Sequence, residues 1–451
     1  MIDNIKLANY KSFFADQVKE AIDEQQKINR SQMRNLFKTG ELSLAYVDSI
    51  QHETGMIILK CPRRMAPRLK VLKGVCIIKK GAKQALGEHV TEWSCRWEEF
   101  VDNKDFHSPG SDMTPMYYVH TGDSNYDYVA CSGFSFKLYD ILSKALVDGK
   151  SLSLIVHNPF PPVEYFRNLA SYMDAFSSND ELNLEPTIDY EEWTPEELAF
   201  DEQKPTGISD TIIDTLANEH CCIVQGPPGT GKSYTIASVI SSYLDAGKTV
   251  CVTTMANKGL IELIKQKPLQ KYVKGGRISK TNLSIDERKQ VSGVKAASAD
   301  LQVPDGEMLC ATNYQLSSVF SEKKMTLYGL PQYDLVVIEE ASQAFLTAIV
   351  AFKQLGIDCL IVGDPMQLPP IVKLNNPQYN SWNVATQVEG LKSMVLGTSI
   401  KSYRIVTTFR LTSRSASLTK CFYGNRFVSV KQDYFCLLYT SPSPRDKRQS
   451  R

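Results

Sequence analysis

The sequence predicts an α/β fold with a parallel sheet covered by helices on both faces, preceded by a smaller β-rich domain. From about residue 208 onward, apolar runs such as CCIVQ, TVCVTT and DLVVIEE alternate with helical patterns. This alternation is typical of parallel sheets, in which both faces of a strand are buried. Ligands of such sheets bind at the carboxyl ends of the strands.

The first 176 residues predict a β-domain between two helices. Apolar residues recur at near-helical spacing up to Phe37, and Gly40 supplies a stop, so we expect a stalk helix at 1–40. The amphipathic stretch 163–176 is expected to pair with it. Short apolar runs separated by glycine and polar turns predict a small β-barrel at 41–156, with a sandwich as the alternative; these runs are LSLAYVDSI, MIILK, VCIIKK, YDYVACS and LSLIV.

Two segments have a strong charge bias. Residues 55–86 carry nine Lys or Arg and no acidic residue, which predicts either a phosphate-binding patch or a solvated face. Residues 180–202 carry ten acidic residues and no basic one, with two prolines. We interpret this second segment as a solvated linker within 157–207, although an acidic strap lying on a basic groove would have the same composition.

The overall composition is that of a globular, membrane-free protein of several domains. The 451 residues exceed what one hydrophobic core usually contains, and the net charge of +1 gives no general attraction to nucleic acid. No run of 18 apolar residues and no secretory-type N-terminus occurs, so we expect a cytoplasmic protein. Most of the eleven cysteines stand singly in apolar runs, without a C-x-x-C pair, which argues against a zinc site.

The sequence GPPGTGKS fits the phosphate-binding loop pattern G-x-x-x-x-G-K-[ST] between a predicted strand and a predicted helix. Its glycines allow backbone N–H groups to curl around a phosphate. Lys232 is expected to reach the β and γ phosphates, and the Ser233 hydroxyl to bind Mg²⁺. We therefore predict ATP and Mg²⁺ as cofactors, with these nucleotide contacts: Gly226, Pro227, Pro228, Gly229, Thr230, Gly231, Lys232, Ser233 and Tyr234.

Two further apolar strands end in polar side chains that belong to the same sheet edge. DLVVIEEASQ ends in Glu339 and Glu340, of which one can hold Mg²⁺ through water and the other can orient the attacking water. CLIVGDPMQLPP places Asp364 and Gln367 where they could sense a γ-phosphate. Read alone, the first could cap a helix and the second could be an ordinary turn.

Taken in order, these motifs resemble those of the superfamily 1 DNA/RNA helicases, and the wording is closest to the branch of the nonsense-mediated decay helicase. Weaker matches are VTTMANKGL at 252–260, CATNYQLSS at 310–318 and TTFRL at 407–411, followed by CFYGNRF. The resemblance covers about 208–430. It implies an AAA-type P-loop in a RecA-like domain at 208–398, and the start of a second RecA-like domain at 399–435.

The resemblance also implies roles for single residues. Glu340 would position the attacking water. Gln367 would link the γ-phosphate to the hold of the protein on the nucleic-acid strand, and Arg410 would extend from the second domain into the ATP site. Mg²⁺ would be held by Ser233 and, through water, by Glu339. The nucleic-acid contacts would come from Thr254, Asn257, Thr312 and Asn313. The expected function is that of an ATP-dependent helicase or translocase, a monomeric motor on single-stranded DNA or RNA.

The sequence departs from the family pattern at three places. Glu339 stands where the family has Asp, and Ser209 stands where the family's adenine-reading glutamine is expected, with Gln203 as a substitute. Motifs V and VI, which supply arginine fingers, are absent, so we expect this chain to hydrolyse ATP poorly even if it binds ATP. Residues 436–451 read as a translated sequencing adapter, and we expect the natural protein to continue beyond residue 435.

Two other functions stay open at this point. The first is a P-loop ATPase switch or a chaperone-like ATPase that does not move along a strand, against which GDPMQLPP argues. The second is a nucleic-acid-binding module that does not hydrolyse ATP, which Glu339 and the missing second half would permit. The motifs do not distinguish DNA from RNA, because strand motors grip the backbone.

Overall fold

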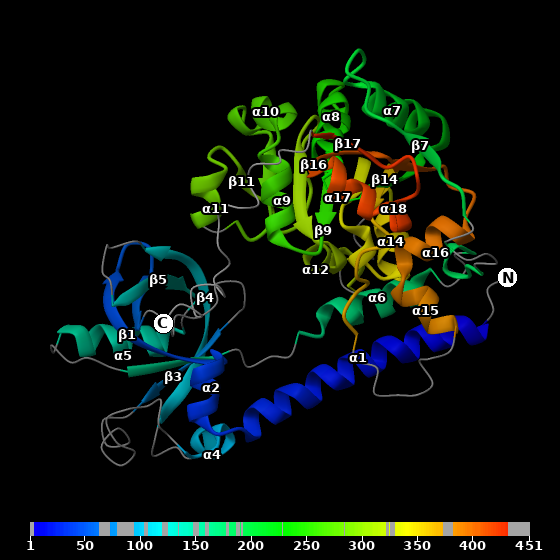
Figure 1. The fold of residues 1–451 in the computed structure, drawn as a ribbon. Helices are drawn as coiled ribbons and strands as arrows, with labels where there is room; N and C mark the ends of the chain where they lie inside the picture. The colour runs from blue at the N-terminus through cyan, green and yellow to red at the C-terminus, as the bar shows by residue number, and fades with distance from the viewer. Residues whose placement is uncertain are drawn as a thin grey trace, which may run out of the picture. The chain divides into compact units, whose positions relative to one another are not determined.

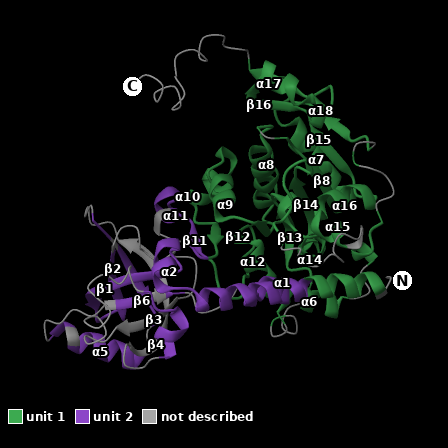
Figure 2. Cartoon of the chain, turned by 60° about the horizontal axis from the view of Figure 1, so that its bottom comes forward, with its two compact units in different colours: residues 1–13, 168–281, 297–451 green, residues 14–167, 282–296 purple. Residues whose placement is uncertain are grey.

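The computed structural model divides the chain into two compact units, which Figure 2 shows in different colours. The first unit contains residues 1–13, 168–281 and 297–451, and the second contains residues 14–167 and 282–296. The structure describes residues 4–62, 73–78, 94–102, 107–119, 125–133, 135–147, 153–157, 162–176, 180–185, 190, 193–227, 229–283, 285–321, 324, 330–372 and 382–431.

The second unit contains a closed antiparallel barrel, as the sequence predicts. Its strands follow one another in the order β1-β2-β5-β4-β3-β6. Their bounds are β1 Leu42–Gln51, β2 Met56–Pro62, β3 Lys73–Ile78, β4 His107–Val119, β5 Tyr126–Ser132 and β6 Ser153–His157. The same unit contains α4 (Trp97–Asp102), α5 (Phe136–Val147), α11 (Ile285–Gln290) and β11 (Lys295–Ala296).

Alternating side chains of the barrel strands fill its interior. Val47, Leu59 and Val129 point into one buried cluster, to which α5 adds Leu138 and Leu142. The sequence patterns predicted five of the strands but neither β4 nor α5. Of the nine basic residues at 55–86, only Lys60 has a side chain that the structure describes, and its ammonium lies 4.2 Å from the centre of the Tyr126 ring.

The helix expected at 1–40 is broken into α1 (Asn4–Arg30) and α2 (Met33–Thr39). The backbone N–H of Met33 donates to the carbonyl of Cys95 at 3.0 Å, and that of Trp97 donates to the carbonyl of Ser31 at 3.0 Å. The backbone groups at 31–33 therefore pair with another segment instead of continuing the helix. Gly40, with φ at 81°, ends α2 where the sequence predicts a stop.

Helix α1 packs along α6 (Glu164–Ala175), as the two amphipathic patterns predict. In the first unit, Lys11 forms an ion pair with Asp174. In the second unit, the rings of Phe14 and Phe166 lie 6.2 Å apart. The buried face of α1 includes Phe13, whose ring lies 5.7 Å from that of Phe345.

The first unit is built on a parallel sheet, of which Figure 1 labels β7, β9 and β14. The strands of this sheet follow one another in the order β10-β12-β9-β13-β14-β8-β15-β7. Every neighbouring pair in this series is parallel. All five residues of β8, of β9 and of β12 are buried, which accounts for their uninterrupted apolar sequences. The bounds are β7 Glu196–Leu198, β8 Cys221–Gln225, β9 Val250–Thr254, β10 Ile278–Lys280, β12 Met308–Thr312, β13 Tyr333–Ile338, β14 Gly356–Gly363 and β15 Ser402–Ile405.

Helices pack on this sheet in two groups. In one group α7 packs against α8, and α8 against α9; in the other, α14, α15 and α16 pack against one another. The helices are α7 Gly207–Glu219, α8 Lys232–Asp245, α9 Asn257–Ile264, α10 Gln270–Lys274, α12 Asn313–Leu316, α14 Leu346–Lys353, α15 Trp382–Val388, α16 Gly390–Gly397, α17 Ser413–Leu418 and α18 Lys420–Tyr423. Short 3₁₀ turns are η2 Asp180–Leu182, η3 Lys267–Leu269, η4 Ser317–Phe320 and η5 Ala341–Gln343.

The acidic segment 180–202 is not a solvated linker in its described parts, and that interpretation was wrong. Leu182, Leu184 and Tyr190 are buried, and β7 pairs with β15 at the edge of the sheet. Glu181 forms an ion pair of 2.6 Å with Lys353. The apolar residues between the carboxylates fix the segment to the sheet, and composition alone does not reveal this.

The range 399–435 begins inside the sheet of the first unit. β15 lies between β8 and β7, so the sheet continues past residue 398, which was the expected end of its domain. A separate two-stranded parallel sheet follows, made of β16 (Thr407–Thr412) and β17 (Val428–Lys431). Residues 436–451, interpreted as an adapter sequence, lie outside the described residues.

The nine cysteines that the structure describes are all free thiols, and most are buried. Over the described part of the chain, no group of acidic, histidine or cysteine side chains is arranged to hold a metal ion by itself. No helix among these residues is long and apolar enough to cross a membrane.

Candidate nucleotide-binding site

The glycine-rich loop joins the carboxyl end of β8 to the first turn of α8. β8 lies between β14 and β15, and the N–H of Gly226 donates to the carbonyl of Gly363 at 3.0 Å. Gly229 and Gly231 have φ values of 81° and 79°, a backbone conformation that glycine adopts without steric cost. The loop therefore has the position and the backbone geometry that phosphate binding requires; Pro228 lies outside the described residues.

Lys232 closes the mouth of this loop. Its ammonium donates to the carbonyls of Gly226 and Pro227, the latter at 3.2 Å. Burial lowers the pKa of Lys232, and the carboxylates of Asp364 and Glu339 oppose this shift. A partly buried ammonium near carboxylates and carbonyl groups can exchange these partners for phosphate oxygens.

Glu339 lies opposite the first turn of α8. Its Oε1 accepts a hydrogen bond of 3.1 Å from the Ser233 hydroxyl, which brings together the two residues predicted to hold Mg²⁺. Burial raises the pKa of Glu339 to about 7. Its other oxygen, Oε2, is buried and has no hydrogen-bond partner among the residues that the structure describes. A buried carboxylate oxygen without a donor, next to a serine hydroxyl, fits a hard cation such as Mg²⁺.

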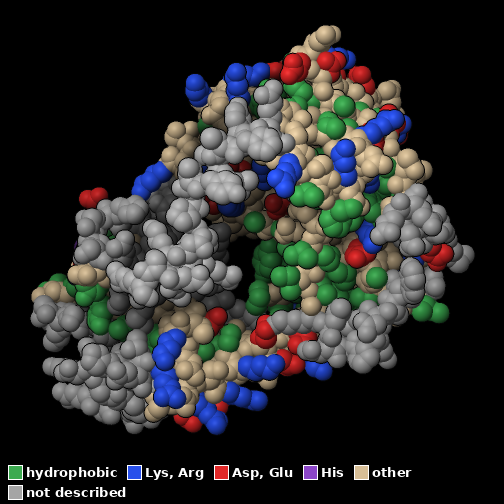
Figure 3. All heavy atoms as spheres, viewed as in Figure 1, with side chains coloured by type: hydrophobic (Ala, Val, Ile, Leu, Met, Phe, Trp, Pro, Cys, Tyr) green, Lys and Arg blue, Asp and Glu red, His purple; other side chains and the backbone are tan. Residues whose placement is uncertain are grey.

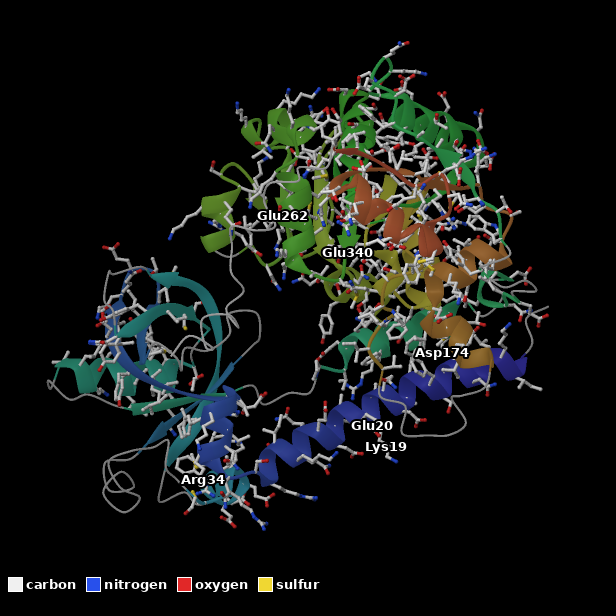
Figure 4. The ribbon with its side chains drawn as sticks, viewed as in Figure 1. Lys19, Glu20, Arg34, Asp174, Glu262 and Glu340 are labelled. Atoms are coloured by element: carbon white, nitrogen blue, oxygen red, sulfur yellow. The ribbon has the colours of Figure 1, made fainter. Side chains whose placement is uncertain are left out.

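Glu340, labelled in Figure 4, has a left-handed backbone, with φ at 54°. Its Oε2 accepts a hydrogen bond of 3.2 Å from the hydroxyl of Thr254 at the end of β9. A non-glycine residue in this conformation costs about 1–2 kcal/mol, and such residues cluster at functional sites. The strained turn directs the side chain toward the strand ends, where it can act on a nucleotide.

Asp364 and Gln367 lie together in the turn after β14. Asp364 is only 3% exposed, and its Oδ1 accepts from the backbone N–H of Met366 at 3.1 Å. Its Oδ2 accepts from Nε2 of Gln367 at 3.2 Å, while Gln367 itself is exposed. The charges of Asp364, Glu339 and Glu340 all act on Lys232, so the side chains that follow β8, β13 and β14 converge as the sequence predicts.

The segment around Arg410 packs directly on the glycine-rich loop. The backbone N–H of Phe409 donates to the carbonyl of Gly229 at 2.8 Å. The Phe409 ring is partly exposed and lies 5.0 Å from that of Phe200, edge to face. Sequence reasoning named Arg410 but missed this aromatic pair, although the Phe beside Arg410 in TTFRL was the available signal.

Gly229→Ala is expected to destabilise the fold and to displace the Arg410 segment. A Cβ at Gly229 would overlap the Cβ of Arg410 and lie 3.0 Å from the Thr408 hydroxyl oxygen. Left-handed strain costs about 1–2 kcal/mol and crowding about 1–3 kcal/mol more. The control is Gly247→Ala, where φ is 75° and nothing lies within 4 Å. Equal losses of unfolding free energy in urea for the two variants would contradict this contact.

Of the four residues predicted to contact nucleic acid, three are buried and Asn257 is half-buried. Thr254, Thr312 and Asn313 have buried side chains, so they do not present a surface to a strand. Thr312 caps α12, and Asn313 accepts a hydrogen bond of 2.7 Å from Thr253. Asn257 accepts one of 2.8 Å from the buried Lys280. These residues shape the strand ends, and the exposed large side chains beside them are Met255 and Tyr314.

Three other predicted positions have ordinary surroundings. Tyr234 is half exposed on α8, and the buried hydroxyl of Thr230 donates to the carbonyl of Pro227 at 2.9 Å. Ser209 is buried, and its hydroxyl donates to the carbonyl of Thr206 at 2.8 Å. Gln203 is exposed in the turn before α7.

The first unit has a parallel sheet, a glycine-rich loop at the carboxyl end of β8 and carboxylates from neighbouring strands. Together these features define a P-loop nucleotide-binding domain of the RecA-like type. A family model described as an AAA domain matches residues 209–373, which include the glycine-rich loop and both carboxylate motifs.

The chain is similar to proteins described as DNA replication ATP-dependent helicase/nuclease. It is 31% identical over 205 residues to dna2 of Schizosaccharomyces pombe, covering 44% of this chain and 14% of that protein. It is 22% identical over 281 residues to DNA2 of Saccharomyces cerevisiae, covering 58% and 17%. The chain thus spans about a sixth of the length of these relatives. The similarity supports the resemblance to superfamily 1 helicases.

The solved structures that match include two helicases. The crystal structure of Arterivirus nonstructural protein 10 (helicase) has a TM-score of 0.27 and 13% identity, over 51% of this chain and 44% of that one. The UvsW helicase from bacteriophage T4 has a TM-score of 0.27 and 10% identity, over 54% and 79%. Scores of this size add nothing to the assignment of the fold.

Proposed function

We propose that this chain is the ATP-binding part of a nucleic-acid-dependent ATPase that works as a helicase or translocase. The proposal rests on one observation: four side chains converge at one edge of the parallel sheet, namely Lys232, Ser233, Glu339 and Glu340. Similarity to helicases over the same region supports it. The closer affiliation with the nonsense-mediated decay branch rests on motif wording alone.

In this proposal the residues divide the work on ATP. The loop amides and Lys232 bind the phosphates, and Ser233 and Glu339 hold Mg²⁺, which neutralises phosphate charge when bound. Glu340 orients and deprotonates the attacking water. Gln367 leaves Asp364 for the γ-phosphate, and Arg410 stabilises the charge that develops there. The Phe409 ring offers a stacking surface for the base, since it is partly exposed beside the loop.

The proposed partner is a single strand of DNA or RNA. The described face of the first unit in Figure 3 carries lysines and arginines interspersed with acidic and hydrophobic side chains, in agreement with the net charge of +1. A strand would therefore be bound by local contacts and not by a general basic field. A monomeric motor, a second RecA-like domain that begins after β15 and a cytoplasmic location belong to the same proposal.

Nucleotide should change the affinity of the chain for a single strand if the two are coupled. The test is fluorescence anisotropy of labelled dT20 and U20, with Mg²⁺ and either no nucleotide, ADP or a non-hydrolysable ATP analogue. We expect the ATP analogue to shift the Kd by about 5-fold or more, the usual size of a coupling between two sites. A Kd that does not respond to nucleotide would favour a plain binding module. Nucleotide binding without strand binding would favour an ATPase switch.

A further inference from the structure

The Asp364 carboxylate accepts hydrogen bonds from two side chains that belong to different parts of the first unit. Its Oδ2 accepts from Nε2 of Gln367 at 3.2 Å and also from the hydroxyl of Tyr423 at 3.0 Å. Its Oδ1 is held by the backbone N–H of Met366. One oxygen is therefore fixed by the turn, while the other is shared by two donors.

Tyr423 is well placed to keep this contact. It is the last residue of α18, and its ring lies 5.4 Å from that of Phe427, which is fully buried. Burial and the charge of Asp364 raise the pKa of Tyr423, so its hydroxyl stays protonated and remains a donor. The resemblance gives no role to this tyrosine.

The same carboxylate also faces the glycine-rich loop. Among the charges that favour the ammonium form of Lys232, that of Asp364 has the largest effect. Asp364 therefore connects the phosphate-binding lysine, the exposed Gln367 and the helix α18. The surroundings of Asp364 would therefore change when a nucleotide binds to the glycine-rich loop.

We propose that Tyr423 is a positioning residue for recognition of the γ-phosphate, an inference that rests on the proposed function. A buried carboxylate oxygen that loses its donors is unfavourable. Gln367 can leave Asp364 for a terminal phosphate because Tyr423 keeps Oδ2 satisfied. Without the tyrosine hydroxyl, Gln367 stays on Asp364, and ATP loses part of its advantage over ADP.

The test is Tyr423→Phe, which removes one hydroxyl and keeps the ring. The Kd values of ADP and of a non-hydrolysable ATP analogue are measured with Mg²⁺ on the 451-residue chain. We expect the ATP analogue to bind about 3- to 10-fold more weakly, the effect of one hydrogen bond to a charged group, and ADP to bind within about 2-fold of the unmodified chain.

The matched control is Tyr243→Phe. Tyr243 donates to Oδ2 of the buried Asp358 at 2.6 Å, so the change removes the same kind of hydrogen bond at the start of β14, the end of that strand opposite to Asp364. This control should leave the ratio of the two Kd values unchanged. A purely structural role of Tyr423 would make the two variants behave alike.

A second measurement uses Gln367→Ala. If Tyr423 acts through Gln367, adding Tyr423→Phe to this variant should not change the ratio further. The inference is overturned by an unchanged ratio in Tyr423→Phe, by equal weakening of both nucleotides, or by a full additional effect in the double variant. If the unmodified chain binds neither nucleotide, the proposed function itself fails, and that result is distinct from these three.

Discussion

Lys232→Ala should abolish measurable nucleotide binding, with a loss of affinity of about 100-fold or more. The ammonium of Lys232 lies at the mouth of the glycine-rich loop, and hydrogen bonds between an ammonium and phosphate are about twice as strong as neutral ones. The side chain is partly buried, and burial lowers the pKa of Lys232. Titration of Mg²⁺·ATP with a fluorescent analogue measures the effect.

The control for this prediction is Lys248→Ala. Lys248 is exposed just before β9, and its ammonium lies 5.0 Å from the centre of the Tyr243 ring. We expect its nucleotide affinity to stay within about 2-fold, since a single exposed charge outside a site contributes little. Circular dichroism of both variants checks the fold. A Lys232→Ala protein that is folded and binds nucleotide within 3-fold would remove the phosphate-loop assignment.

The parts of the fold that the sequence predicted are those in which pattern and packing agree. Runs such as Cys221–Gln225 and Val250–Thr254 are uninterruptedly apolar because both faces of these strands are buried. The barrel strand Leu42–Gln51 was recognised because it is a short apolar run between glycine and polar turns, and its first four residues are buried. Long-range contacts account for the misses. The break between α1 and α2 depends on pairing with Cys95 and Trp97, which no local pattern contains.

The site was predictable as far as it consists of motifs with fixed spacing. Lys232, Ser233 and Glu339 meet because parallel strands place consecutive motifs at one edge. The predicted nucleic-acid contacts were less well chosen, because a motif does not show which of its side chains turns inward. Thr254 turns to Glu340, and the neighbouring Met255 is exposed. The contact of Tyr423 with Asp364 spans 59 residues and had no sequence signal.

Glu340→Gln should slow ATP hydrolysis by about 100- to 10 000-fold while ATP binding changes little, because an amide keeps the shape of the side chain but accepts no proton. The Thr254 hydroxyl can still donate to the amide oxygen, so the strained turn at residue 340 is retained. Phosphate release from radiolabelled ATP under single-turnover conditions measures the effect even if the unmodified chain is slow. Glu262→Gln is the control, since Glu262 is exposed on α9 in the same unit and is also labelled in Figure 4. Unchanged hydrolysis in Glu340→Gln would transfer the role of base to Glu339, the adjacent carboxylate.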